Sequence, residues 1–335
     1  MKDDAILFEL SGEHPTLPEA EVISCLHAEC GSFEVVARGP GYVASRFPEG
    51  RLDAVAGRLA LTHRVGRYLG SCTLERLSRF SESLVLPPGS VSVRAKQFRG
   101  SYHSTDTLKV SEKVGGILGK RTEIDLEAPD VELRILMSDM IHFYVGERRV
   151  DRRQYDRRKV ALRPFFSPIS LHPRYARALV NLSRVRRGER LLDPFCGTGG
   201  ILIEASLLGA RALGSDISEE MVEGCKENMS HFGAGWEDMR VADVGRVRDE
   251  FGLVDAIVTD PPYGRSATTK KEPPWALHRR AIGAMADALR EAGTLAAAFP
   301  APCMSEVVGL DLRENHVQRV HRSLMRHYCV FTRRL

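Results

Sequence analysis

Short apolar segments alternate with longer helical segments from residue 189 almost to the C-terminus, and this alternation limits the possible folds more than any other feature of the chain. A strand followed by a helix and another strand implies a right-handed crossover, so the pattern predicts a doubly wound, mostly parallel sheet of the α/β class. The predicted strands are ERLLDPF, ARALGSD, DMRVAD, VDAIVTD and GTLAAAF, at residues 189–195, 210–216, 238–243, 254–260 and 293–299.

The C-terminal end of the chain departs from this alternation. Residues 317–324 (VQRVHRSL) and 326–334 (RHYCVFTRR) both have strand character, and little separates them. Strands joined so closely run in opposite directions. We therefore expect one of them to lie antiparallel at the edge of the sheet.

The first 147 residues predict two smaller α+β units. The first contains strand-like segments and two helical stretches, of which the second is LDAVAGRLALTHRV at 52–65. The other contains the alternating strand SVSVRAKQF, a helix that starts after Ser104 or Thr105, and a final hairpin of VELRILMSD and MIHFYVG. We expect domains at 1–70 and 71–147, a basic linker at 148–165, and a C-terminal domain at 166–335.

Positive charge is concentrated in one segment. Residues 148–190 hold 14 Lys and Arg against 3 Asp and Glu, whereas the whole chain has a formal net charge of only +4. A solvated linker is the ordinary explanation of such a run, but the excess is mostly arginine, which binds phosphate oxygens through paired N–H donors. The segment therefore favours an anionic polymer as partner. The residues expected to bind it are Arg148, Arg149, Arg152, Arg153, Arg157, Arg158 and Lys159.

A glycine-rich turn follows the first strand of the alternating region, in LLDPFCGTGGILIEA. Gly197, Gly199 and Gly200 allow the backbone to turn tightly and to approach a ligand at the N-terminus of the next helix. Such a turn can bind a dinucleotide, but the spacing is G-x-G-G, and Asp193 would place a negative charge against a pyrophosphate. A ligand with a cationic amino group and no phosphate fits better, and the methionine end of S-adenosylmethionine is such a ligand.

Two further strands end in aspartate on the same side. Asp216 ends the second strand, where a carboxylate can accept hydrogen bonds from both ribose hydroxyls, and Asp243 ends the third, where it can accept one from an adenine amino group. A single aspartate at a strand end is usually only a cap for the following helix, but three in succession favour an adenosyl cofactor. The residues expected to bind it are Asp193, Cys196, Gly197, Thr198, Gly199, Asp216, Ile217, Asp243, Val244 and Asp260.

The fourth strand ends in the sequence DPPYG, residues 260–264. In a doubly wound sheet of strand order 3-2-1-4-5 this loop lies beside the glycine turn. An exocyclic base amine is a poor nucleophile because its lone pair is conjugated with the ring. Hydrogen bonds from its N–H groups to Asp260 and to the Pro261 carbonyl favour a pyramidal nitrogen aimed at the methyl donor, and Tyr263 offers a face for base stacking. We therefore predict methylation of a base amino group, with Asp260, Pro261 and Tyr263 as catalytic residues.

This chemistry requires neither a metal nor a covalent nucleophile, and Cys196 in the glycine turn is interpreted as a small packing residue. The seven cysteines contain no CxxC pair, so no metal site is predicted. No stretch approaches the roughly 20 apolar residues of a membrane span, and the acidic start MKDDAILFEL is unlike a secretory signal. We expect a cytoplasmic, monomeric protein.

The two motifs DPFCGTGG and DPPYG resemble those of the class I amino-methyltransferases that act on nucleic acids. The stretch RPFFSPISLHPRYARALVNLSRV (163–185) is similar to the corresponding segment of the archaeal and eukaryotic tRNA guanine-N2 methyltransferases that modify position 10. The N-terminal half resembles the ferredoxin-like and THUMP domains of these enzymes. The resemblance implies a Rossmann-like domain that methylates guanine N2 once or twice, and a THUMP domain that binds the acceptor end of tRNA. It assigns Asp260 and Tyr263 to the guanine.

Three other interpretations remain open. The first is an enzyme of the same architecture that acts on position 6 of tRNA or on ribosomal RNA. The second is a DNA amino-methyltransferase, which would share the DPPY chemistry but is not expected to carry a THUMP-like region. The third is a non-catalytic RNA-binding protein with a decayed methyltransferase fold, although such a protein should have lost some of the site residues.

Overall fold

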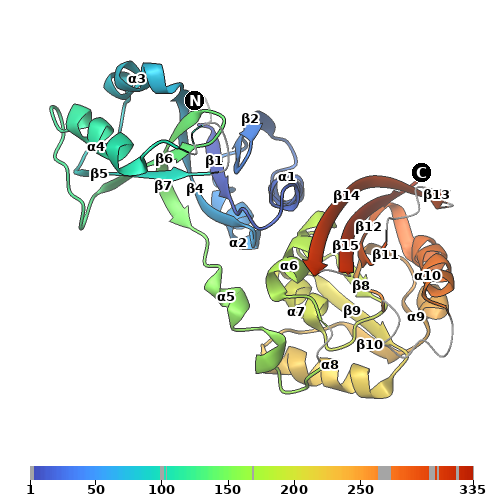
Figure 1. Ribbon diagram of the computed structural model, residues 1–335. Coiled ribbons are helices and arrows are strands. Elements are labelled where there is room, and N and C mark those ends of the chain that lie inside the picture. The colour runs from blue at the N-terminus through green and yellow to red at the C-terminus, as the bar shows by residue number, and fades with distance from the viewer. Residues whose placement is uncertain are drawn as a thin grey trace. The chain divides into compact units, whose positions relative to one another are not determined.

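The computed structural model describes residues 4–98, 102, 104–167, 170–262, 273–301, 306–307, 309–321 and 324–334. The chain divides into two compact units (Figure 1). The first unit comprises Met1–Gly57 and Leu61–Asp151, and the second comprises Arg58–Ala60 and Arg152–Leu335. Arg152–Lys159, most of the densest basic run, therefore belong to the second unit. In the described parts of the chain, no helix is both long and apolar enough to cross a membrane.

The first unit contains one seven-stranded sheet with the order β2-β3-β1-β4-β7-β6-β5. All neighbours are antiparallel except β5 and β6, which are parallel. Strand β4 crosses the predicted boundary at residue 70, so the sheet is continuous through both predicted N-terminal regions. The strands are β1 Ile6–Leu10, β2 Glu34–Gly39, β3 Tyr42–Arg46, β4 Thr62–Cys72, β5 Val91–Gln97, β6 Val131–Met137 and β7 Ile141–Arg149.

The helices of this unit agree with the sequence in part. The helix predicted over 52–65 is wrong in its second half, because it ends at Arg58 and the chain becomes strand from Thr62. Pairing of β4 with β1 and β7 satisfies the backbone there and overrides the local helical pattern. The helix expected after Ser104 or Thr105 begins at Thr107, capped by Asp106. The helices are α1 Leu17–Cys30, α2 Leu52–Arg58, α3 Leu77–Ser83 and α4 Thr107–Leu118, with a 3-10 turn η1 at Leu74–Arg76.

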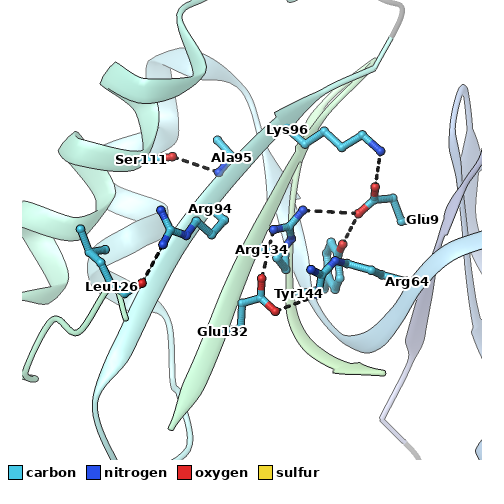
Figure 2. Close-up of polar contacts among 10 residues, drawn as sticks. All are labelled: Glu9, Arg64, Arg94, Ala95, Lys96, Ser111, Leu126, Glu132, Arg134 and Tyr144. Atoms are coloured by element: carbon cyan, nitrogen blue, oxygen red, sulfur yellow. Dashed lines mark hydrogen bonds and ion pairs between the residues drawn. The ribbon is translucent and has the colours of Figure 1, made fainter. Parts of the chain in front are cut away.

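A polar network links side chains of β1, β4, β5, β6 and β7 in this sheet (Figure 2). At its centre lies Glu9, which is only 1% exposed. Its carboxylate accepts a hydrogen bond from the Tyr144 hydroxyl and forms an ion pair with Lys96 Nζ at 2.5 Å. Arg134 lies 4.0 Å from the same carboxylate. Burial raises the pKa of Glu9, but these partners more than offset it, so the pKa is lowered and the group is ionised. The sheet therefore holds a charged network on one face, with Lys96 reaching solvent.

The second unit contains an eight-stranded sheet with the order β10-β9-β8-β11-β12-β15-β14-β13. Its first five strands are mutually parallel and confirm the predicted order 3-2-1-4-5. A buried core that includes Leu192, Ile257, Phe251 and Met285 packs helices α9 and α10 against the sheet. The strands are β8 Arg190–Asp193, β9 Arg211–Asp216, β10 Asp238–Val241, β11 Val254–Thr259, β12 Leu289–Phe299, β13 Glu306–Val307, β14 Leu310–His321 and β15 Leu324–Arg333.

Helices α6 to α10 of the second unit connect or flank these strands (Figure 1). The helices of this unit are α5 Arg153–Asp156, α6 Pro173–Leu182, α7 Gly200–Leu207, α8 Glu219–His231, α9 Val247–Phe251 and α10 Pro274–Ala288, with 3-10 turns η2 at Val160–Leu162 and η3 at Val244–Arg246.

The prediction of an antiparallel edge strand needs correction. Antiparallel β15 lies inside the sheet, between β12 and β14, and β13 forms the edge. The reason is hydrophobicity. Tyr328 to Phe331 of β15 are buried, so this strand suits an inner position. Strand β14 carries charged residues such as Asp311 and Arg313 and suits a position nearer the edge.

Candidate active site

Four aspartates lie at the carboxyl edge of the second sheet, where parallel strands β8 to β11 end. Asp193 and Asp216 are the last residues of β8 and β9, Asp260 directly follows β11, and Asp243 follows β10 by two residues. The chain leaves β8 toward β9 on one side, while β11 pairs on the other side, so Asp193 and Asp260 flank the topological switch point of the sheet. This is the position at which open α/β sheets bind their ligands.

The turn after β8 needs glycine for reasons of conformation and space. Gly197 and Gly199 have φ values of +47° and +80°, in the left-handed region that L residues rarely adopt. A Cβ on Gly199 would lie 2.7 Å from Cys225 Sγ, so a side chain would also clash. Both predicted glycine positions thus expose a tightly turned backbone at the N-terminus of α7.

Asp193 is a buried carboxyl group beside this turn. It is 1% exposed, and its Oδ1 accepts hydrogen bonds from the Thr259 hydroxyl at 2.7 Å and from the Phe195 backbone N–H at 3.1 Å. Burial raises its pKa to about 7, and the charges of Asp260 and Asp216 add to the increase. A cation best stabilises a carboxylate in these surroundings. The amino group in the methionine part of S-adenosylmethionine is such a cation.

Asp216 holds the turn from the neighbouring strand. Its carboxylate accepts hydrogen bonds from the backbone N–H groups of Gly197 at 3.1 Å and Ser218 at 3.0 Å. Burial raises its pKa. Both carboxylate oxygens retain lone pairs for ribose hydroxyls, and half-buried Ile217 follows directly.

Asp243 and Val244 are positioned by η3 and by α10. The Asp243 carboxylate caps η3 through the Gly245 N–H at 2.8 Å and forms an ion pair with Arg280 of α10 at 2.5 Å. Val244 is buried beneath it. An adenine amino group would therefore share this carboxylate with Arg280, a partner that the sequence analysis missed.

The side chains of Cys196 and Thr198 face the interior of the unit. Cys196 is buried, and a hydrogen bond with Cys225 together with burial raises the pKa of its thiol, which argues against a nucleophile. The Thr198 hydroxyl accepts a hydrogen bond from Arg163 Nη1 at 2.9 Å. Both residues can therefore serve a ligand only through their backbone groups.

The loop after β11 is tied to α10. Pro261 is buried, and the Pro262 carbonyl accepts a hydrogen bond from His278 Nε2 at 3.0 Å. Burial lowers the pKa of His278, which keeps the ring neutral, and the ring packs edge-on against Phe299. Tyr263 lies outside the described residues. His278 was not predicted, because nothing in the local sequence links it to the loop.

An aromatic pair lies near Asp260 and was also missed by the sequence analysis. Tyr175 of α6 and Tyr328 of β15 stack with ring centroids 6.0 Å apart and planes 16° apart. Burial raises the pKa of Tyr328, and the charge of Asp260 contributes to the increase. The pair connects residues that are more than 150 positions apart, which no sequence spacing could reveal.

The predicted RNA-binding residues divide between the two units and between outward and inward positions. Arg148 and Arg149 end β7 in the first unit, and Arg148 forms an ion pair with Asp53. In the second unit Arg153, Arg157 and Lys159 are exposed, and Arg152 and Arg158 are half-buried.

Arg158 differs from the outward residues of the run because it points into the second unit. It donates to Glu204 from Nε at 2.7 Å and from Nη2 at 3.0 Å.

Among the residues that the structure describes, no three His, Cys, Asp or Glu side chains come together in a way that could hold a metal ion.

The site combines a buried carboxylate that favours a cation, a tight glycine turn, and an acidic, proline-containing loop across the switch point. These features suit the transfer of a methyl group from S-adenosylmethionine to an amine. The second unit is an S-adenosylmethionine-dependent methyltransferase domain, and residues 161–328 match the RMKL-like methyltransferase domain family. The chain is 37% identical over 330 residues to the tRNA (guanine(10)-N2)-dimethyltransferase of Methanothermobacter thermautotrophicus, covering 95% of this chain and 96% of that protein. The chain belongs to the tRNA (guanine(10)-N2)-dimethyltransferase family.

Two further comparisons agree. The tRNA (guanine(10)-N2)-dimethyltransferase of Pyrococcus abyssi is 35% identical over 288 residues, or 83% of this chain and 85% of that protein. The crystal structure of TrmN from Thermus thermophilus superposes with a TM-score of 0.57 and 24% identity, over 98% of this chain and 99% of that one. The second likeness concerns the fold, and it extends through both units.

Proposed function

We propose that the chain transfers methyl groups from S-adenosylmethionine to the N2 amine of guanosine 10 in tRNA, first to the monomethyl and then to the dimethyl product. The observation that carries the proposal is that two acidic groups with different roles stand at the ends of neighbouring parallel strands, Asp193 at the end of β8 and Asp260 directly after β11. Asp260 stands at the start of the DPP loop, and its charge acts on buried Asp193 beside the glycine turn.

The residues of the turn and of the strand ends would hold the cofactor, which supplies an electrophilic methyl group on its sulfonium sulfur. Asp193 would pair with the cationic amino group, and the backbone of Gly197 to Gly199 would contact the methionine part. Asp216 would accept from the ribose hydroxyls, while Asp243 and Val244 would contact the adenine. These roles match the charges and hydrogen-bond capacity of the described groups.

The DPP loop would orient the guanine. In the first transfer one N–H of the N2 amine donates to Asp260 and the other to the Pro261 carbonyl, so that the nitrogen lone pair points away from both acceptors and toward the methyl group. In the second transfer the monomethylated amine has a single N–H, which donates to Asp260. The amine becomes cationic as the new N–C bond forms, and the Asp260 carboxylate stabilises this charge and can take the proton. The hydrogen bond from His278 to the Pro262 carbonyl holds the loop in place, and because the His278 ring is neutral it adds no positive charge beside Asp260.

Binding of tRNA would involve both units. We assign the first unit to a ferredoxin-like domain and a THUMP domain, and the exposed end of Lys96 in the charged network offers a cation for an RNA backbone (Figure 2). In the second unit, exposed Arg153 and Arg157 are suited to phosphate contact. We expect the enzyme to act as a monomer in the cytoplasm.

The test is methylation of unmodified tRNA transcripts with radiolabelled S-adenosylmethionine, followed by nuclease mapping and nucleoside analysis. We expect label only at guanosine 10, as monomethyl and dimethyl N2-guanosine, and none in a transcript with adenosine at that position. Label at position 6, in ribosomal RNA or in DNA would contradict the proposal. Binding of tRNA without any transfer would instead support a non-catalytic protein.

A further inference from the structure

Arg163 is a buried arginine that reaches the cofactor turn from outside it. It is 5% exposed, and its Nη1 donates hydrogen bonds to the Thr198 hydroxyl at 2.9 Å and to the Ser170 hydroxyl at 3.1 Å. Its Nε donates to the Arg158 carbonyl at 3.3 Å. Arg163 therefore links the segment between η2 and α6 to the centre of the glycine turn.

A second contact fixes Thr198 through its backbone. Asn228 of α8 donates from Nδ2 to the Thr198 carbonyl at 3.0 Å and to the Phe165 carbonyl at 2.9 Å. Its Oδ1 accepts from the Phe165 N–H at 2.9 Å. Thr198 is thus held at its hydroxyl by Arg163 and at its carbonyl by Asn228. The Asn228 side chain also binds the backbone of Phe165, two residues after Arg163.

The location of Arg163 is unfavourable on electrostatic grounds. Its guanidinium lies at the N-terminus of α7, where a Cβ on Gly200 would come within 3.1 Å of Nη2, and the positive end of a helix repels a cation. Burial lowers the pKa of Arg163, and nearby Glu204 only partly offsets this cost. An apolar side chain of similar size would fill the space without these penalties. The hydrogen bonds that only a guanidinium can make in this geometry explain why an arginine is there.

The carboxylate that compensates this charge is shared. Glu204, 1% exposed, forms ion pairs with Arg158 at 2.7 Å and with Arg177 at 2.9 Å. Arg177 therefore lies in the same buried cluster as Arg163, where it donates to Glu204. It offers a matched control.

We propose that Arg163 is a positioning residue for the cofactor: through the Thr198 hydroxyl it holds the Gly197–Gly199 turn in the conformation that binds S-adenosylmethionine. The inference rests on the proposed function of that turn. It gives the segment between η2 and α6 a part in the cofactor site, which Arg163 plays through Thr198.

The experiment is a double-mutant cycle on the full-length protein, read out as the dissociation constant for S-adenosylmethionine by isothermal titration calorimetry. Arg163→Met removes the donor, and Thr198→Val removes the acceptor with little change of shape. We expect each to weaken binding about 10-fold, the range for a hydrogen bond to a charged group, and the double variant to be no weaker than either single variant.

Three further variants separate positioning from stability. Thr198→Ser keeps the hydroxyl and should bind S-adenosylmethionine as tightly as wild type does. Arg163→Lys keeps a charged donor and should bind S-adenosylmethionine more tightly than Arg163→Met, which makes the comparison possible even if Arg163→Met folds poorly. Arg177→Met should lower Tm but leave the dissociation constant unchanged. The inference is overturned if Arg163→Met and Thr198→Val both bind the cofactor as wild type does, whatever their Tm, or if their effects multiply in the double variant. Failure of the wild-type protein to bind S-adenosylmethionine would instead refute the proposed function.

Discussion

The hydroxyl of Thr259 donates a 2.7 Å hydrogen bond to Asp193 Oδ1 and so connects the last residues of β11 and β8 directly at the switch point of the sheet. This bond lowers the pKa of Asp193 against the effect of burial. It couples the strand that leads into the DPP loop to the carboxyl group that we assign to the cofactor.

Replacement of Thr259 by Val should weaken cofactor binding at neutral pH. Without the hydroxyl the pKa of Asp193 rises further, and less of the carboxylate is available to pair with a cation. We expect about a 10-fold increase in the dissociation constant at pH 7, measured by calorimetry. Thr259→Ser, which keeps the donor, is the control, and equal binding by the two variants would refute the role of this bond.

Cofactor affinity should fall as pH decreases through about 7, because burial raises the pKa of Asp193 to about 7 and only its ionised form attracts the cationic amino group. The sign follows from linkage: a bound cation favours the ionised carboxylate, so binding releases a proton below this pH and none well above it. Titrations in buffers of different ionisation enthalpy measure that proton. In Asp193→Asn the affinity should be low and independent of pH across this range, and a pH dependence retained in that variant would count against the assignment.

Asp260→Asn should reduce kcat by about 10²-fold to 10³-fold, the usual effect of losing one group that stabilises developing charge. Binding of tRNA and of cofactor should change by less than about 3-fold at pH 8, which filter binding and calorimetry can check. The charge of Asp260 also raises the pKa of Asp193, so the variant should shift the pH midpoint of cofactor binding downward, opposite to Thr259→Val. Normal turnover by Asp260→Asn would exclude it as the catalytic carboxylate.

Replacement of Arg153 and Arg157 by Ala should weaken tRNA binding and reduce its salt dependence. Each phosphate contact that is lost should change the slope of log K against log salt by about 0.7 to 0.9, as filter binding at several salt concentrations would show. An unchanged slope would mean that the exposed side of the run is only solvated.

Arg158→Met is the matched comparison for this double variant, because Arg158 is paired with buried Glu204. It should lower the free energy of unfolding by about 1–3 kcal/mol and leave the salt slope unchanged. A loss of salt slope in Arg158→Met would show that this side chain also contacts RNA.

The amino-acid sequence by itself was sufficient to predict the order of the five parallel strands of the second sheet and the edge at which its aspartates lie. The reason is that right-handed crossovers between parallel strands bring every strand end to one edge, so Asp193, Asp216, Asp243 and Asp260 could be placed from their positions after apolar segments. The glycine turn was predictable for the same kind of reason, since left-handed backbone requires glycine locally.

Only the tertiary structure decided which groups these residues contact. Burial of β15 inside the sheet depends on competition between β14 and β15 for the apolar position, and the change from helix to strand at Thr62 depends on pairing with β1 and β7. Within the basic run, Arg153 faces solvent and Arg158 faces Glu204, although both have the same local sequence character. The contact of Arg163 with Thr198 joins positions that are 35 residues apart. Such contacts follow from packing and charge compensation in three dimensions, which no periodicity along the chain records.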